Sequence, residues 1–465
     1  MIQIIVKTTM SYNKRGLDAH IKRFKSVLLG VLIIVPWFHG CDVLDVESED
    51  SIPASEAFKD KKGIEKGILG SYDAMQSLSY YGRSFSILPD LSSDDLLHPD
   101  EATSTDYAEV ANNAILPENS SVEGIWNAIY NTVNTANSVV VKVPEMSDMT
   151  DDEKSKALGE LYFIRALCHF NLVNLFGAVP IKTEPTVGTS QLDVARDSVA
   201  DVYEQIIDDL TFAEQHLSVS ASTKTRATVY AATALLARVY LYNKQYDLAY
   251  EKANEVIVLG GYTLLPSVAA VFADDGSAET IFEIDFTSDD RNRVAEYNLP
   301  KTLNGRYEVA PTESLAGVFE NGDTRSEASV AMDGANVYAN KYIDLKTGAD
   351  NVVVLRLSEM YLIRAEALAR SENPVVKDIQ DDVNAVRNRS GLGDTPASTV
   401  AGLIDAIARE RRVELAFEGH RWFDLVRTGK AVGTISGLTD KRMTLYPIPS
   451  SEVLTNKLMK QNPGY

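Results

Sequence analysis

Three glutamates spaced four residues apart, Glu410, Glu414 and Glu418, are the carboxylates in this sequence whose spacing best suits acid and base chemistry. On a helix they would share one face, and paired carboxylates hydrolyse glycosidic bonds. Three arginines lie close by in the sequence, namely Arg411, Arg412 and Arg421. Arginines beside glutamates on one helix favour an ion-pair network that fixes the adjoining turn. We therefore interpret these glutamates as structural and keep a helical glycosidase as the alternative.

Loop aromatics with polar neighbours offer a different chemistry, because sugar rings stack on aromatic faces and their hydroxyls bond to Asp, Asn and Arg. Three segments have this composition, "SYYGRS", "STDYAEVANN" and "RNRVAEYNLPKTLNGRY". For each tyrosine the alternative is burial against the helices. The candidate ligand-binding residues are Tyr80, Tyr81, Arg83, Tyr107, Asn112, Asn113, Arg291, Arg293, Tyr297, Asn298 and Tyr307.

The cysteines and histidines predict no metal site and no cofactor. The chain has two cysteines, Cys41 and Cys168, and six histidines whose positions resemble no zinc-binding spacing. Cys168 lies in the apolar stretch "ELYFIRALCHFNLVNLFG", which is typical of a buried helix. We expect Cys168 to be a small core residue.

The N-terminal segment has the layout of an export signal. Lys22, Arg23 and Lys25 precede an apolar run that ends at Gly40 and Cys41, directly before acidic residues. The run is short for a membrane span, so we expect a lipoprotein signal over residues 1–40, which is removed, with lipid on Cys41. Met10 is an alternative start, and a buried helix with an incidental cysteine is the alternative interpretation.

The charge of the chain limits its partners. Lysine and arginine total 45 against 66 acidic residues, a formal net charge of −21. A field of this sign repels nucleic acid and anionic membrane surfaces, so we expect no nucleic-acid partner. After Cys41 no second apolar run is long enough to span a membrane, which leaves the lipid as the expected anchor.

Helical hairpins are expected to position the candidate residues. The repeats "YFIRAL", "YAATAL" and "YLIRAE" place a tyrosine and an alanine four residues apart, as in tetratricopeptide hairpins where small residues admit large ones. We predict a mostly α-helical fold of such hairpins, with long inserted loops at residues 89–123 and 285–350. The hairpins are expected at residues 125–141, 157–217, 227–257 and 355–387.

Several segments together resemble the SusD/RagB family, the nutrient-binding surface lipoproteins of Bacteroidetes. The most specific are "RERRVELAFEGHRWFDLVRTG" and the ending "LYPIPSSEVLTNKLMKQNPGY". Also similar are "VLRLSEMYLIRAEALAR", "APTESLAGVFENGDTR", "IWNAIYNTVNTANSVV" and "CDVLDVES". In that family the first motif is a framework element, which implies that Trp422 and Phe423 are core residues; Trp126 is expected in the core on the same argument.

The resemblance implies a SusD-like fold with a few short strands, in which regions 41–220 and 221–465 pack as one globular unit. It also implies a cell-surface protein, lipid-anchored to the outer membrane, that captures oligosaccharide without catalysis and delivers it to a SusC-type TonB-dependent transporter. Family members commonly bind glycan through loops at about the places selected above. The acid after Cys41 resembles the family's signal for the outer face of the membrane. A lipid-anchored glycosidase, a protein-binding repeat scaffold and a peptide ligand remain the alternatives.

Overall fold

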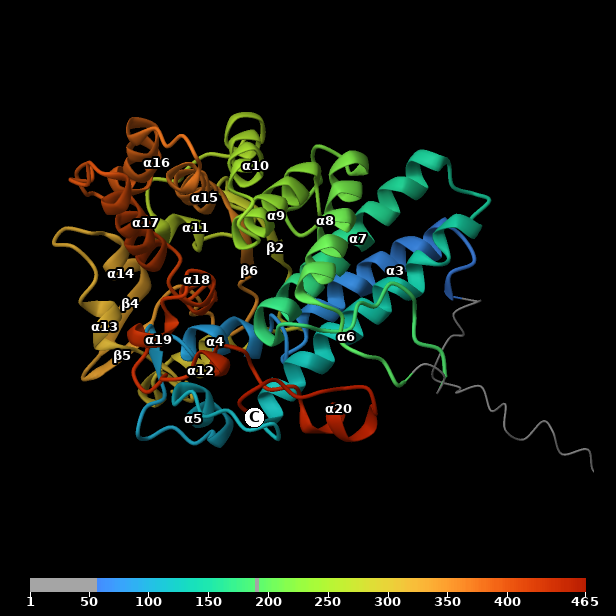
Figure 1. Cartoon of the computed structure of the whole chain (residues 1–465), viewed down its shortest axis with the longest axis horizontal. Coiled ribbons are helices and arrows are strands. Elements are labelled where there is room, and N and C mark those ends of the chain that lie inside the picture. Colours follow the sequence, from blue (N-terminus) through green and yellow to red (C-terminus); the bar gives the residue numbers. More distant parts are fainter. Residues whose placement is uncertain (1–56, 189–191) are drawn as a thin grey trace, which may run out of the picture. The chain divides into compact units, whose positions relative to one another are not determined.

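Helices make up most of the computed structural model, which describes residues 57–188 and 192–465 (Figure 1). The stretch Ala57–Tyr465 forms one compact unit. Among the described helices, none is both long and apolar enough to cross a membrane. The predicted signal over residues 1–40 and the lipidation site Cys41 lie outside the described residues.

The first half of the unit is built on long helices: α3 (Lys61–Asp73), α6 (Ser120–Val140), α7 (Asp151–Phe176) and α8 (Val199–His216). Helix α7 begins at a capping box, in which Thr150 and Glu153 satisfy each other's backbone amides. It ends at Gly177, whose positive φ suits glycine. Helix α7 packs against α3, α6 and α8, and it buries Cys168 completely, as predicted.

The second half contains the hairpins α9 (Val229–Tyr242) with α10 (Tyr246–Leu259), and α15 (Leu357–Arg370) with α16 (Val376–Arg389), followed by α17 (Val400–Glu414). Fully buried alanines on both members of the first hairpin, Ala237, Ala249 and Ala253, allow the close packing expected of tetratricopeptide-like pairs. Helix α10 also packs on α15, which joins hairpins far apart in the sequence. Three of the four predicted hairpins are confirmed; the prediction for residues 125–141 is wrong, because that segment is the single helix α6.

Short strands form three antiparallel pairs in the described chain. Strand β1 (Leu96–Leu97) pairs with β3 (Ala310–Pro311), β2 (Thr280–Ile284) with β6 (Val352–Arg356), and β4 (Val330–Asp333) with β5 (Asn336–Ala339). The β1–β3 pair therefore connects the two long loops predicted from the sequence.

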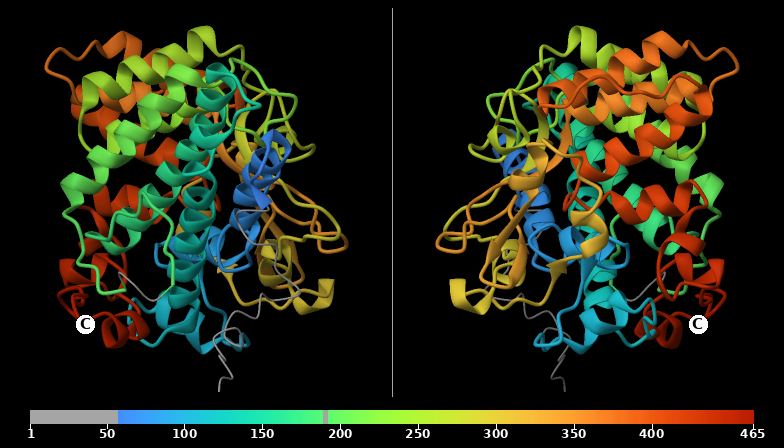
Figure 2. Two further views of the ribbon diagram at one scale, coloured as in Figure 1. Left: turned by 90° about the vertical axis from the view of Figure 1, so that its right-hand side faces the viewer. Right: turned by 90° about the vertical axis from the view of Figure 1, so that its left-hand side faces the viewer.

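Short helices lie in these two loops and in other connections of the described chain. The segment 285–350, yellow in Figure 2, lies beside the blue and cyan segment that holds α4 and α5. The short α-helices are α4 (Ser84–Leu91), α5 (Thr105–Ala111), α11 (Val268–Val271), α12 (Val294–Asn298), α13 (Glu313–Ala316), α14 (Arg325–Ser329), α18 (Arg421–Arg427), α19 (Ala431–Thr434) and α20 (Ser450–Thr455). The 3-10 helices are η1 (Ala74–Gln76), η2 (Val143–Glu145), η3 (Lys301–Leu303) and η4 (Lys441–Thr444).

The predicted ion-pair network of the glutamates is confirmed, with one correction. Helix α17 ends at Glu414, and Phe417 has a positive φ, so Glu418 lies in the turn and does not continue the helix face. Its carboxylate accepts from Arg356 Nε at 2.7 Å and Lys341 Nζ at 2.6 Å. Because Arg356 Nη1 also donates to Glu414 Oε1 at 2.6 Å, the network joins this turn to β6.

Further ion pairs hold the rest of the motif. Glu410 accepts from Arg325 Nη1 at 2.8 Å and from Arg387 Nη1 at 2.5 Å. Arg411 pairs with Asp424, Arg412 with Asp95 and Arg421 with Asp94. The aromatic residues predicted for the core, Trp126, Trp422 and Phe423, are buried. The motif thus connects α17 and α18 to loops from both halves of the chain.

Candidate functional site

The three loop segments selected from the sequence meet around one ring, that of Tyr297 in α12. The Arg293 amide donates to Gly82 O at 2.7 Å, which joins the third segment to the first. Arg83 Nη1 donates to the Tyr297 hydroxyl at 2.8 Å. The ring of Tyr107 in α5, from the second segment, lies with its centroid 5.5 Å from that of Tyr297. Residues separated by about 200 positions therefore form one cluster.

Two guanidinium groups lie over the Tyr297 ring, at distances to its centroid of 4.8 Å for Arg83 and 5.0 Å for Arg306. Cations are attracted to the face of an aromatic ring. Tyr297 is only 7% exposed, whereas the Arg306 side chain is 45% exposed. Arg306 is thus an exposed side chain that lies over a buried ring.

An ion pair on α12 lies beside this ring. Arg293 and Glu296 form it one helical turn apart, and both side chains are partly exposed. The hydrogen bond from Arg293 lowers the pKa of Glu296, and the charges of Arg306 and Arg83 add to this effect against a smaller opposing effect of burial. The surface next to Tyr297 therefore offers charged donors and acceptors together.

A buried carboxylate, that of Glu308, fixes α5 against this site. It accepts from the Thr103 amide and hydroxyl at 2.9 and 2.7 Å and from the Ser104 amide at 2.9 Å, just before α5. Arg306 Nη2 donates to it at 3.2 Å. Burial alone would raise the pKa of Glu308, but these hydrogen bonds lower it to about 2. Glu308 therefore carries its charge at neutral pH and holds two of the three segments together.

The other predicted residues lie around this cluster or below it. Tyr80 and Tyr81 are buried, and both hydroxyls accept from Asn171 Nδ2 in α7, at 2.7 and 3.0 Å. Tyr107 and Asn298 are buried as well. Tyr307 is buried at a positive φ and donates its hydroxyl proton to Val337 O in β5 at 2.9 Å.

Three of the predicted residues lie nearer the surface. Asn112 is exposed at the end of α5, where its side-chain amide donates to Ala108 O at 2.7 Å, and Asn113, with a positive φ, follows it. Arg291 is exposed, and its guanidinium donates to Leu345 O at 2.7 Å. Arg291 therefore supports the neighbouring loop.

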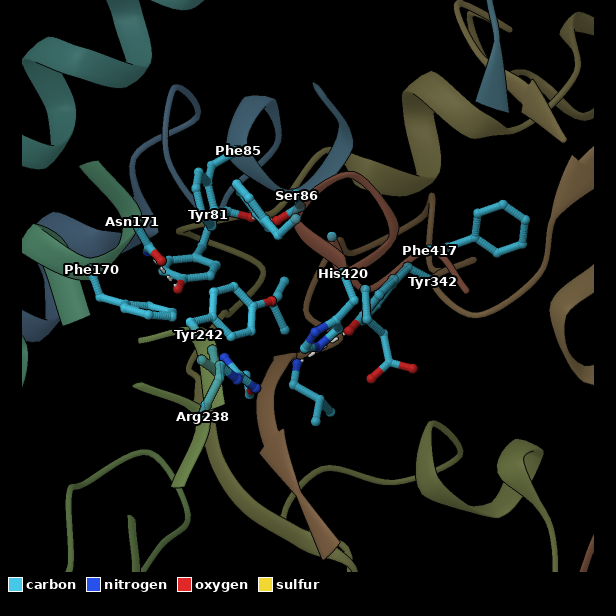
Figure 3. A pocket seen from close by; sticks show the side chains of 16 residues that line it. Tyr81, Phe85, Ser86, Phe170, Asn171, Arg238, Tyr242, Tyr342, Phe417 and His420 are labelled. Carbon is cyan, nitrogen blue, oxygen red and sulfur yellow. Dashed lines mark hydrogen bonds between the residues drawn. The ribbon is translucent and has the colours of Figure 1, made fainter. Parts of the chain in front are cut away.

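Tyr81 lines a cavity of about 50 Å³, which none of Tyr297, Tyr107 and Arg306 lines (Figure 3). Arg238, Tyr242, Tyr342 and His420 line it from other elements. Burial lowers the pKa of His420 to about 4, so its ring is neutral at neutral pH. The volume is far below the roughly 300–1,000 Å³ of typical ligand pockets. The cavity is a part of the core lined by both apolar and polar side chains.

Arg306 and Glu308 were not selected from the sequence, although both lie directly after the "LNG" turn. The signal for Arg306 was its place beside Tyr307, since a basic residue next to a loop aromatic is the same pattern that selected Arg83. Nothing in the sequence places Glu308 beneath α5, because that contact spans about 200 residues.

Comparison with known proteins agrees with the helical fold. Residues 42–241 match the family model described as "Starch-binding associating with outer membrane", and residues 324–439 match the model of the SusD family. The structure is similar to that of a SusD superfamily protein from Bacteroides vulgatus, with a TM-score of 0.81 and 22% identity over 88% of this chain and 100% of the other. A laminarin binding SusD-like protein gives a TM-score of 0.78 and 28% identity over 87% and 100%.

Curated relatives extend the similarity along the sequence. SusD-like protein P38 of Formosa agariphila is 26% identical over 518 residues, covering 96% of this chain and 100% of that protein. Starch-binding protein SusD of Bacteroides thetaiotaomicron is 30% identical over 173 residues, covering 35% and 29%. The fold and these matches define a helical protein of the SusD type. The chain belongs to the SusD/RagB family.

Proposed function

We propose that this protein captures oligosaccharides at the cell surface and delivers them, without catalysis, to a SusC-type TonB-dependent transporter of the outer membrane. Family membership supports this proposal, as do the names of relatives that bind starch and laminarin. Three loops that are far apart in the sequence meet at Tyr297, beneath an exposed arginine. This observation is the reason for assigning the binding site to that cluster.

The cluster offers both kinds of contact that sugars need. Arg293, Glu296 and Arg306 present hydrogen-bonding groups for hydroxyls at the surface. Arg306 makes one hydrogen bond of 3.2 Å to Glu308, so its displacement by a ligand would uncover the Tyr297 ring for stacking. Arg83 would then hold the ring in place from its hydroxyl end.

The remaining predicted residues take supporting roles in this proposal. The buried group of Tyr80, Tyr81, Tyr107, Asn298 and Tyr307 shapes the loops from below. Exposed Asn112 and Arg291 lie on the loops that flank the cluster.

The state of the motif glutamates supports a non-catalytic role. A glycosidase needs one carboxyl that is protonated near neutral pH. Burial would raise the pKa of Glu418, but the charges of Arg356 and Lys341 outweigh burial and lower this pKa to about 2. The charges of Arg389 and Arg356 lower the pKa of Glu414 in the same way. Both carboxylates are therefore ionised and bound to arginine or lysine side chains, so neither is a protonated acid.

We further propose that residues 1–40 are a signal peptide and that Cys41 carries the lipid. In this proposal the mature chain consists of two regions, 41–220 and 221–465, which pack as one globular unit. The description of the matched family, which associates with the outer membrane, supports this placement.

Affinity electrophoresis with a polysaccharide panel that includes laminarin and starch tests the site. Tyr297→Ala should weaken binding by about 1–3 kcal/mol, roughly tenfold to hundredfold, because a stacking ring is lost. Arg306→Ala should also weaken it, and its exposed position makes misfolding a minor concern. Arg442→Ala is the matched control, at an arginine in η4 whose side chain is 60% exposed and also pairs with one carboxylate. Wild-type binding by both site variants would place the ligand elsewhere.

A further inference from the structure

A second groove opens between α6, the segment that follows α7, and α20. In Figure 1, α20 lies beside the N-terminal part of α6, well apart from α12. The groove has a volume of about 200 Å³, and its lining includes Trp126, Asn127, Tyr130, Asn134, Lys182 and Glu452. None of these residues belongs to the Tyr297 cluster.

The wall on α6 is a regular helix face. Asn127, Tyr130 and Asn134 are spaced three and four residues apart, so they lie on one side of the helix. The Tyr130 hydroxyl donates to Pro180 O at 2.9 Å, and Asn134 Oδ1 accepts from the Thr186 amide at 2.8 Å. These bonds fix the Tyr130 ring and the facing segment, so this side of the groove is formed in advance of any ligand.

The opposite wall is anchored as firmly. The Ser450 amide donates to Pro117 O at 2.8 Å, and Ser451 Oγ donates to Glu123 at 2.5 Å, which attaches α20 to the start of α6. The Asn456 side chain accepts from the Val194 amide at 3.1 Å and donates to its carbonyl at 2.8 Å. Preformed walls reduce the entropy lost when a ligand binds.

Polar groups line the floor and the sides of this groove. Trp126 is only 2% exposed, and its indole N–H has no hydrogen-bond partner among the described residues. It lies close enough to the Glu452 carboxylate to lower the pKa of that group. A buried donor without a partner is costly. Asn127, Lys182 and Glu452 line the groove beside Tyr130, so it offers both donors and an acceptor to a polar ligand.

We propose that this groove is a second saccharide site, which takes one neutral sugar ring against Tyr130 and bonds its hydroxyls with Asn127, Lys182 and Glu452. The inference rests on the proposed glycan-binding function but concerns different residues. The amides and the ammonium supply donors, and the carboxylate accepts from hydroxyls. The volume is below that of pockets for drug-sized ligands, which agrees with a single ring.

The charges of the groove favour a neutral ligand over an acidic one. Glu184 and Glu452 line it together with the one cation Lys182. Glu123 lies close enough to help burial raise the pKa of Glu452, while Trp126 and Lys182 oppose that rise. An anionic sugar would meet more negative than positive charge and would be repelled.

Tryptophan fluorescence of the full chain, titrated with maltohexaose, laminarihexaose and oligogalacturonate, tests this site. We expect a saturable change with at least one neutral probe and none with oligogalacturonate. Trp126→Phe should abolish the change, because the Trp126 ring lies 4.9 Å from that of Tyr130, whereas Trp422 does not line the groove and Trp37 lies in the predicted signal. Asn127→Ala and Glu452→Ala should each raise the half-saturating concentration about tenfold, because one hydrogen bond is lost. Asn131→Ala, exposed on the same helix but outside the groove, should leave it unchanged.

The outcomes separate this inference from the proposed function. If neutral probes bind with a loss in Tyr297→Ala but give no fluorescence change, the groove is not a sugar site and the proposed function stands. A response to oligogalacturonate, or one that survives Asn127→Ala and Glu452→Ala, also overturns the inference. If no probe binds by either measurement, both proposals fail. Thermal melts of each variant guard against unfolding.

Discussion

Tyr297 and Tyr80 look alike in the sequence, since each is a tyrosine in a polar segment between helices, yet their neighbours give them different roles. Tyr80 is enclosed by α7, where it hydrogen-bonds to Asn171 and Cys168. Tyr297 lies under Arg306, whose side chain reaches solvent. The sequence therefore predicts which loops carry aromatic residues. It does not predict which ring lies nearest the surface, because that depends on contacts about 200 residues away.

Glu418→Gln should destabilise the fold without changing ligand affinity. The side chain is 2% exposed, and its loss of charge would leave Arg356 and Lys341 short of a partner. Removing one member of a buried ion pair costs about 3–5 kcal/mol. Because the folded-state pKa is lowered to about 2, this contribution is present above about pH 4.3 and is lost as pH falls toward 2.

Denaturant unfolding at pH 7 measures the effect of Glu418→Gln. The matched control is Glu145→Gln, in an exposed ion pair with Lys142, which should change stability by less than about 1 kcal/mol. Equal effects of the two substitutions would contradict the network's structural role. Normal stability combined with lost hydrolysis of a glycan would revive the glycosidase alternative.

Asp90→Asn should stabilise the protein at pH 8 and not at pH 5. Burial and the nearby Asp95 raise the pKa of Asp90 to about 8, although the Gly419 and Arg421 amides oppose this. The folded state therefore holds this proton more tightly than the unfolded chain, so wild-type stability falls as pH rises from about 4 toward 8. Asparagine keeps an acceptor for the Gly419 amide and removes the titration. Thermal melts at both pH values measure the difference; an equal shift at each would contradict the prediction.

At the scale of elements, sequence periodicity predicted the helical hairpins whose two members lie close together in the sequence. The alanine and tyrosine spacing located the hairpins α9–α10 and α15–α16 because small and large residues alternate within each pair. It failed at α6, whose partner α7 lies beyond a connection that carries no such pattern. A few short strands were expected from the resemblance, but neither they nor the short helices of the two long loops were placed, because tertiary contacts, such as β1 with β3, hold them.

Glu308→Gln should loosen α5 and weaken glycan binding although Glu308 is buried under the proposed ligand surface. The carboxylate accepts three hydrogen bonds at the start of α5 and a fourth from Arg306. A neutral amide can satisfy only part of these. Hydrogen exchange of residues 103–107 should quicken by about tenfold, consistent with the loss of roughly 1–2 kcal/mol. Unchanged exchange there, with unchanged affinity, would show that α5 is held by other contacts.

At the scale of the whole molecule, the ion-pair network joins elements from both halves of the chain, since Arg412 pairs with Asp95 and Arg421 with Asp94. The loops that meet at Tyr297 are carried on this common framework. A chain built in this way can vary its loops while its helices stay fixed, which suits a binding protein.

Cys41→Ala should release the protein from the membrane. Wild type is expected to partition into detergent and to be cleaved by protease on intact cells, whereas the variant should stay soluble or unprocessed, because a lipid chain supplies most of the anchoring energy. Detergent phase separation and immunoblotting measure this. Unchanged partitioning of Cys41→Ala would contradict the lipoprotein interpretation.

The central claim is that this protein binds glycan and does not cleave it. The most direct measurement is to incubate the purified chain with the polysaccharide panel, and to record in the same samples both the electrophoretic retardation of the protein and the release of reducing ends. We predict retardation by at least one polysaccharide, its loss in Tyr297→Ala, and no reducing ends above the blank after prolonged incubation. Release of reducing ends, or retardation by no polysaccharide in the panel, would contradict the account.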